Sequence, residues 1–186
     1  MFARTALIDL RNAALVVGLL ALLSLLAAAC APADGSVPPA ARRPHVTAID
    51  AVAAGEYLIR VGSCDDCHTP GWGESGGSIP DSLRLMGGAL GFRGPWGTSY
   101  PANLRLSVQH KNATQWIAAI RSRQGLPPMP WFTLHHMSEQ DLAAIHAYLA
   151  SLGAKGQPAP AALPPGVVPT TPYIPFMPVF PEEVSE

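Results

Sequence analysis

A short run in the first half of the chain, Cys64-Asp65-Asp66-Cys67-His68, combines two thiols and an imidazole within five residues. Two cysteines separated by two residues and followed at once by histidine are the pattern of c-type haem attachment. Thiols at this spacing reach the two vinyl groups of one porphyrin, and the adjacent histidine is placed to bind the iron. The motif therefore predicts one covalently bound haem c, held through Cys64 and Cys67, with His68 as an iron ligand.

Two other uses of a Cys-x-x-Cys motif fit this sequence less well. A thioredoxin-like redox pair opens a helix after a buried strand, whereas this motif follows a predicted helix and precedes a stretch rich in Gly and Pro. A zinc site takes four ligands, and the chain has no second Cys-x-x-Cys and no paired histidine motif. Haem attachment is the interpretation that the surrounding sequence favours.

The second axial position of the iron needs a ligand from farther along the chain. Methionine in that position is common in electron-transfer haems and raises the reduction potential. Met129 lies in Pro127-Pro128-Met129-Pro130, where prolines stiffen the loop without helical order. Met137 precedes a predicted helix cap and fits a packing residue, while His135 and His136 remain alternatives. We expect Met129 to be the second iron ligand.

Other side chains could support a haem without binding its iron. Pro70 or Pro80 could offer a carbonyl to the outer N–H of His68, the kind of bond that orients a metal-bound histidine. Four residues of the following loop carry donors suited to haem propionates, although ordinary loop packing is an equal alternative: Arg93, Trp96, Tyr100 and Asn103.

The first part of the chain, residues 1–29, has the pattern of a secretory signal. Arg4 and Arg11 precede an apolar run that ends in small residues directly before Cys30. This ending is similar to a bacterial lipobox, in which the cysteine takes up lipid and becomes the mature N-terminus. A plain signal peptide and an uncleaved membrane anchor are the alternatives. All three interpretations place the rest of the chain on the periplasmic side. The lipoprotein interpretation also anchors it to the membrane through a lipidated Cys30.

The elements that must position the motif follow from the spacing of apolar residues and from capping residues. Residues 30–46 indicate a flexible tether, and a helix is predicted from Thr47 toward Cys64, with Gly55 allowing the last helix to approach closely. Asn112 and Ser138 are predicted N-caps of two further helices, which are joined to the first by long loops without a sustained period. The prediction is an all-α domain over residues 47–153, with three to four helices around one haem.

Composition limits the classes of function. The 186 residues carry a net charge of −1, which does not suit binding to the phosphates of a nucleic acid. Three cysteines are too few for a disulfide-rich scaffold. Two of them are explained by the haem and the third, Cys30, by a lipid anchor.

Several short segments, taken in order along the chain, resemble the single-domain class I-like cytochromes c, especially the cytochrome subunits of periplasmic alcohol and gluconate dehydrogenases. The resemblance covers about residues 47–153 and rests on these segments: 55–58 and 64–70, 95–103, 116–121, 128–131 and 137–149. Those subunits usually carry several haem motifs and a Thr-Pro after the equivalent of Asn103, whereas this chain has one motif and Leu104-Arg105. The resemblance implies a cytochrome c-like fold with Met129 as ligand.

Two classes of function are open at this point. The first is an electron-transfer protein, not itself an enzyme, that carries single electrons through its haem between a dehydrogenase and the respiratory chain. Its redox partner would be a dehydrogenase subunit or a terminal oxidase. The alternative is a haem enzyme or a redox or gas sensor, which needs an open or labile sixth position on the iron.

The C-terminal segment, residues 154–186, is an unusual tail with nine prolines. Five of them recur every third residue from Pro169 to Pro181, which is the period of polyproline II. Aromatic and aliphatic residues between them make all three edges of such a helix apolar. We expect the tail to lie across its own domain or to dock on a partner subunit, and a disordered tail is the alternative.

Overall fold

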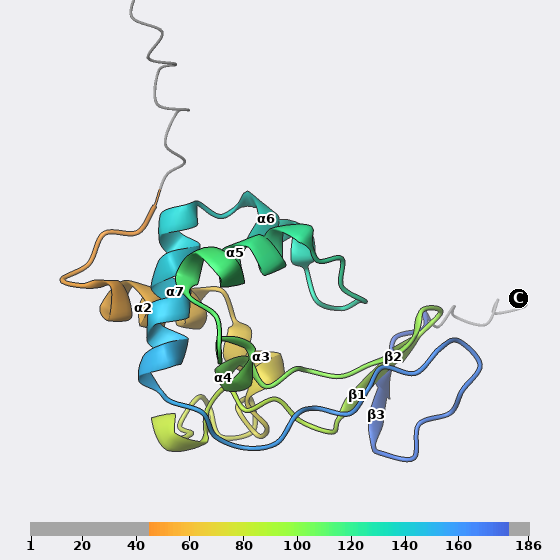
Figure 1. The fold of residues 1–186 in the computed structure, drawn as a ribbon. Helices are drawn as coiled ribbons and strands as arrows, with labels where there is room; N and C mark the ends of the chain where they lie inside the picture. The colour runs from red at the N-terminus through yellow and green to blue at the C-terminus, as the bar shows by residue number, and fades with distance from the viewer. Residues whose placement is uncertain (1–44, 179–186) are drawn as a thin grey trace, which may run out of the picture. The chain divides into compact units, whose positions relative to one another are not determined.

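The computed structural model of the chain describes residues 45–178 (Figure 1). The predicted signal with Cys30, most of the predicted tether and the last residues of the tail, from 179 on, lie outside the described residues. Within residues 45–178, no helix is long and apolar enough to cross a membrane.

Three helices form where the capping and periodicity signals predict them: α2 (Ala51–Val61), α5 (Ala113–Ser122) and α7 (Glu139–Ser151). The side chain of Asn112 accepts a hydrogen bond from the backbone N–H of Gln115, whose side chain bonds back to the N–H of Asn112. This is a full capping box. At the start of α7, the hydroxyl of Ser138 accepts from the N–H of Asp141. Both predicted caps are confirmed.

Helices α2 and α7 cross in direct backbone contact. A Cβ atom placed on Gly55 of α2 would lie only 2.0 Å from the carbonyl oxygen of Ala144 and 2.7 Å from Cβ of Tyr148, both on α7. The predicted role of Gly55 is therefore confirmed, because any side chain would push the helices apart. Around this crossing, α2, α5 and α7 supply most of the buried apolar residues: Ala54, Leu58, Ile59, Trp116, Ile120, Leu142, Ala144, Ile145, Tyr148 and Leu149.

Shorter elements connect the main helices. They are α3 (Cys64–His68), the 3₁₀ turn η1 (Asp81–Leu83), α4 (Leu104–Ser107) and α6 (Trp131–His136). The turn α3 carries the Cys-x-x-Cys-His motif and begins three residues after α2 ends. It therefore joins the helix pair to the long segment that follows.

A small sheet stands beside the helices, which the all-α prediction did not include. Its strands are β1 (Gly91–Gly94), β2 (Gly97–Ser99) and β3 (Tyr173–Pro175), in the order β2–β1–β3. β1 pairs antiparallel with β2 and parallel with β3. Strands of three or four residues are too short to produce a recognisable alternation in sequence, so this stretch was predicted as irregular loop. The cytochrome c-like fold stays a prediction.

The tail lies along its own domain as far as residue 178 (Figure 1). Leu163 and Thr98 exchange two backbone hydrogen bonds of 2.9 Å, and the N–H of Phe176 donates to the carbonyl of Arg93 at 2.7 Å. The side chain of Asn103 also donates to the carbonyl of Lys155, at the start of the tail. Of the arrangements predicted from sequence, the structure shows the one in which the tail packs on its own domain.

Candidate haem site

The Cys-x-x-Cys-His motif forms a single helical turn, α3, directly after α2. Residues three apart in a helix lie on the same side, so Cys64 and Cys67 are neighbours in space, with His68 at the end of the turn. Both thiols are free rather than joined in a disulfide. Cys67 is exposed and Cys64 half-buried, while His68 is only 8% exposed. The turn therefore exposes the thiol of Cys67, packs Cys64 against the core and buries most of its imidazole.

The two thiols do not have the properties of a reactive redox pair. Burial, together with the neighbouring charges of Asp65 and Asp66, raises the pKa of Cys64 to about 11. Burial and Asp66 also raise the pKa of Cys67. A thioredoxin-like dithiol instead needs a lowered thiol pKa to form the attacking thiolate. The electrostatics of the turn therefore disfavour the redox-dithiol interpretation of the motif.

The imidazole of His68 is held in the orientation and tautomer that a metal ligand requires. Its Nδ1 lies 2.7 Å from the carbonyl oxygen of Ala102, and because a carbonyl only accepts, Nδ1 must carry the proton. Burial lowers the pKa of His68, although the bond to Ala102 and the charge of Asp65 act in the opposite direction. The Nε2 lone pair is then available, and Nε2 has no hydrogen-bond partner among the described residues.

The carbonyl that orients His68 is not one of those predicted from sequence. The sequence suggests Pro70 or Pro80, but the acceptor is Ala102, 34 residues from His68. The segment containing Ala102 is brought there partly by hydrogen bonds from Gly87 to His68 and from Gly88 to Pro101. No signal in the sequence marks Ala102, since every residue offers the same backbone carbonyl.

Met129 lies in the loop between α5 and α6 and is half-buried. The hydroxyl of Ser99, at the end of β2, donates to the carbonyl of Pro127, so this loop and the β1–β2 hairpin are held side by side. Its rival Met137 packs against the hydrophobic core, as a residue preceding a helix cap often does. Ligation of iron by Met129 stays a prediction.

The two histidine alternatives differ in their surroundings. His136 is exposed, and His135 is half-buried with its Nε2 2.9 Å from the carbonyl oxygen of Ile120. That ring nitrogen is therefore already engaged within the chain.

The four predicted propionate contacts divide into two groups. Asn103 caps α4 by accepting from the N–H of Leu106, and its amide donates to the carbonyls of Lys155 and Gln157. The hydroxyl of Tyr100 lies 3.1 Å from that of Thr171. These two side chains thus bond to the chain itself, chiefly to the tail.

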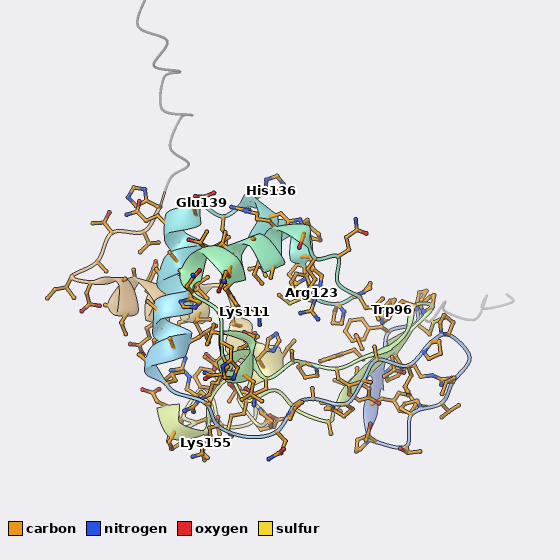
Figure 2. The ribbon with its side chains drawn as sticks, in the orientation of Figure 1. Trp96, Lys111, Arg123, His136, Glu139 and Lys155 are labelled. Atoms are coloured by element: carbon orange, nitrogen blue, oxygen red, sulfur yellow. The ribbon has the colours of Figure 1, made fainter. Side chains whose placement is uncertain are left out.

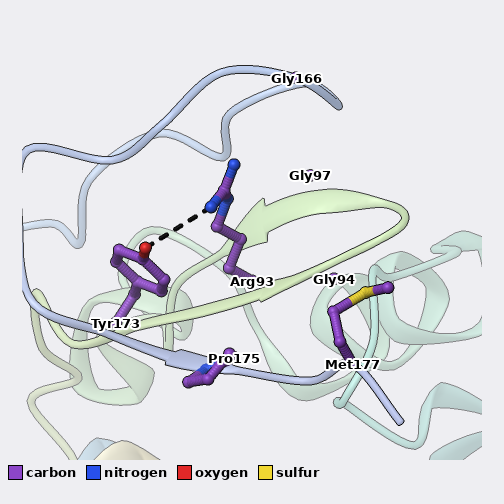
Figure 3. A pocket seen from close by; sticks show the side chains of 7 residues that line it. All are labelled: Arg93, Gly94, Gly97, Gly166, Tyr173, Pro175 and Met177. Atoms are coloured by element: carbon purple, nitrogen blue, oxygen red, sulfur yellow. Dashed lines mark hydrogen bonds between the residues drawn. The ribbon is translucent and has the colours of Figure 1, made fainter. Parts of the chain in front are cut away.

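The remaining two candidates are in the hairpin. Successive side chains of a strand point to opposite faces, so Arg93 lies on the other face of β1 from Phe92. Phe92 is paired in register with Ser99, whose hydroxyl reaches the Met129 loop, whereas Arg93 is paired with Thr98. The guanidinium of Arg93 instead stacks on Tyr173, 5.4 Å from the ring centre, beside a cavity of about 320 Å³ lined also by Gly166 and Met177 (Figure 3). Arg93 therefore faces the tail.

Trp96, in the turn between β1 and β2 (Figure 2), retains an unused donor. Among the described residues, three buried side-chain atoms have no hydrogen-bond partner: Nε1 of Trp96, Oγ1 of Thr98 and Nε1 of Trp131. Buried donors are almost always paired, so each of them lacks a hydrogen bond that an acceptor from outside the chain would supply. A haem brings two carboxylates, and the residues therefore fit such a group. The sequence had assigned no role to Trp131 or Thr98.

A buried ion pair inside the motif was also missed. The carboxylate of Asp65, between the two cysteines, is bound by the guanidinium of Arg84 at 2.6 Å. Asp65 is buried and Asp66 is exposed, and the sequence alone does not show which of the two neighbouring aspartates is buried. By contrast, residues 45–178 bring together no group of three or more His, Cys, Asp or Glu side chains of the kind that holds a metal by itself.

Comparison of the chain with protein-family models, with curated proteins and with solved structures found no match in any of the three. The functional interpretation therefore depends on the residues and geometry described above.

Proposed function

We propose that this protein is an exported c-type cytochrome that carries single electrons through one haem. The observation that carries the proposal is the state of His68 at the end of a free Cys-x-x-Cys turn. It is buried, its Nδ1 proton is held by the carbonyl of Ala102, and its Nε2 is available. Metal-bound histidines almost always have this second hydrogen bond.

The residues of the chain have separate parts in this function. Cys64 and Cys67 would form the thioethers, His68 would bind the iron from one side and Met129 from the other. Bound haem supplies a one-electron iron couple whose potential depends on the axial ligands and the burial of the site. Trp96 and Trp131 provide buried N–H donors suited to carboxylates.

The cellular setting is part of the same proposal. Haem attachment of this kind requires export, which agrees with the signal predicted over residues 1–29. Lipidation of Cys30 would hold the domain at the periplasmic face of the membrane. Electrons would pass from a dehydrogenase to the respiratory chain, and substrate oxidation would take place in the partner protein.

Covalent haem binding is the direct test. The full-length chain should be expressed in a bacterium with a c-type maturation system, alongside the C64S/C67S variant. We expect peroxidase staining of haem to stay with the wild-type chain on a denaturing gel. The pyridine haemochrome spectrum should be that of a haem with two thioethers, and the double variant should show neither signal. If a control c-type cytochrome acquires haem in the same cells and the wild-type chain does not, the proposal is refuted.

The state of the sixth position separates an electron carrier from a haem enzyme or gas sensor. We expect the ferric protein to show the near-infrared charge-transfer band of methionine bound to iron, and the ferrous protein to bind carbon monoxide slowly or not at all. A missing band with immediate carbon monoxide binding would instead support the enzyme or sensor.

The predicted anchor has its own test. Wild-type protein should fractionate with membranes and enter the detergent phase, while C30S should be released in soluble form or not be processed. Equal behaviour of the two would refute lipidation at Cys30 without affecting the haem.

A further inference from the structure

A buried ion pair joins Asp65, inside the predicted haem attachment motif, to Arg84. Arg84 reaches Asp65 with two donors, Nε to Oδ1 at 3.1 Å and Nη2 to Oδ2 at 2.6 Å. Both side chains are withdrawn from solvent, with Arg84 0% and Asp65 1% exposed. This is the two-point geometry that a guanidinium and a carboxylate form best. It places one charge of each sign beside Cys64, at the base of the attachment turn.

The pair is connected to the elements on both sides of the turn. The remaining guanidinium nitrogen donates to the hydroxyl of Tyr148, on α7, at 3.0 Å and to the carboxylate of Asp81 at 2.7 Å. On the other side, the hydroxyl of Thr69 donates to Asp65 at 2.6 Å. These bonds attach the turn to the last helix. The hydrogen bonds that Arg84 donates to Asp65 raise the pKa of the guanidinium, which therefore stays protonated.

A buried ion pair is a poor source of stability, which makes its position informative. Removing two charges from water is costly, and their mutual attraction roughly offsets that cost. An apolar pair of similar volume would hold α3 against α7 at least as well. What the ion pair adds is fixed orientation together with local neutrality, since neither charge is screened by water.

We propose that Asp65 and Arg84 are positioning residues that orient the attachment turn and, as a neutral pair, set the reduction potential of the haem. The inference rests on the proposed function. In the haem-loaded protein, reduction would add one electron from the donor protein at an iron held by His68, and no bond or proton of the pair would change. A buried charge nearby must therefore alter the potential. An unpaired cation disfavours the more positive ferric state and raises the potential.

The experiment is a charge cycle with a matched control. D65N preserves the shape of the side chain and leaves Arg84 without its buried partner, although the largely exposed Asp81 remains. D66N removes the same charge from the neighbouring, exposed residue of the same motif. D65N/R84Q removes both charges. Spectroelectrochemical titration of each purified holoprotein should show a raised midpoint for D65N, little change for D66N, and a return toward wild type for D65N/R84Q.

Two results would overturn the inference. One is a D65N midpoint that equals that of D66N or falls below wild type. The other is a midpoint of the double variant that differs from wild type as much as that of D65N does. A purely structural role predicts this result, because each substitution would disturb the turn further. The near-infrared methionine band should be recorded for each variant, so that a change of axial ligand is recognised.

R84K keeps the experiment decisive if D65N does not accumulate. Lysine retains the cation but lacks the two-point contact, so less chain should acquire haem while the midpoint stays near wild type. A shifted midpoint in R84K with an intact methionine band would overturn the electrostatic part. Absence of haem from the wild-type chain would refute the proposed function itself, whereas normal haem with an unresponsive midpoint would refute only this inference.

Discussion

Replacement of Gly55 by alanine should separate α2 from α7 and destabilise the domain. The added methyl group would lie 2.0 Å from the carbonyl oxygen of Ala144 and 2.7 Å from Cβ of Tyr148. Both neighbours belong to the crossing helix close to its backbone, so neither can rotate away as the end of a long side chain would. The helices must therefore move apart, and packing around the crossing loosens.

The size of this effect follows from two opposing contributions. Alanine is the better helix former and gains about 1 kcal/mol over glycine inside a helix. Overpacking of a well-filled core costs roughly 1–3 kcal/mol, and a contact with backbone belongs at the upper end. The free energy of unfolding should fall by about 2 kcal/mol. With a urea dependence of about 2 kcal/mol per molar, the unfolding midpoint should fall by about 1 M.

Urea unfolding followed by far-ultraviolet circular dichroism measures this shift. Gly73 supplies the matched control, because a Cβ there meets no atom within 4 Å and its backbone is not in the left-handed region. G73A should change the free energy of unfolding by less than about 0.5 kcal/mol. A G55A midpoint at or above that of wild type would refute the close crossing of α2 and α7.

Three further predictions concern the ligand, the tail and the histidine. M129A should lose the near-infrared methionine band of the ferric protein, whereas M137A should keep it; a band that survives M129A refutes the ligand assignment. G97A should loosen the tail, because its Cβ would meet the carbonyl oxygen of Leu163 at 2.0 Å in a residue with φ of 99°. Limited proteolysis should then cut the tail faster than in wild type, and equal rates would contradict the packing of the tail. Folding lowers the pKa of His68 below its ordinary value of 6.5. Just below pH 6.5 the unfolded chain therefore binds more protons than the folded chain. The haem-free protein should lose stability as the pH falls through that range. Urea midpoints of wild type and H68Q across the range should converge at acid pH, and parallel curves would contradict the prediction.

Local signals predicted the helical part of the fold well. A cap needs only a side chain that reaches a backbone N–H two or three residues later, so Asn112 and Ser138 could be recognised without knowledge of the fold. Gly55 was recognisable because a glycine inside an apolar helix pattern usually has a packing reason. The short strands gave no such signal, because three or four residues cannot establish a period.

The motif determined by itself which residues could bind a haem, because its chemistry depends on spacing within one helical turn. Only the tertiary structure decided what surrounds that turn: the carbonyl of Ala102 on His68, the burial of Asp65 against Arg84, and the tail paired with β1. These contacts join residues 19 to 82 positions apart. Backbone carbonyls are alike in every sequence, and neighbouring aspartates differ only in which one faces the core. Such choices depend on the packing of the whole chain, which no local pattern records.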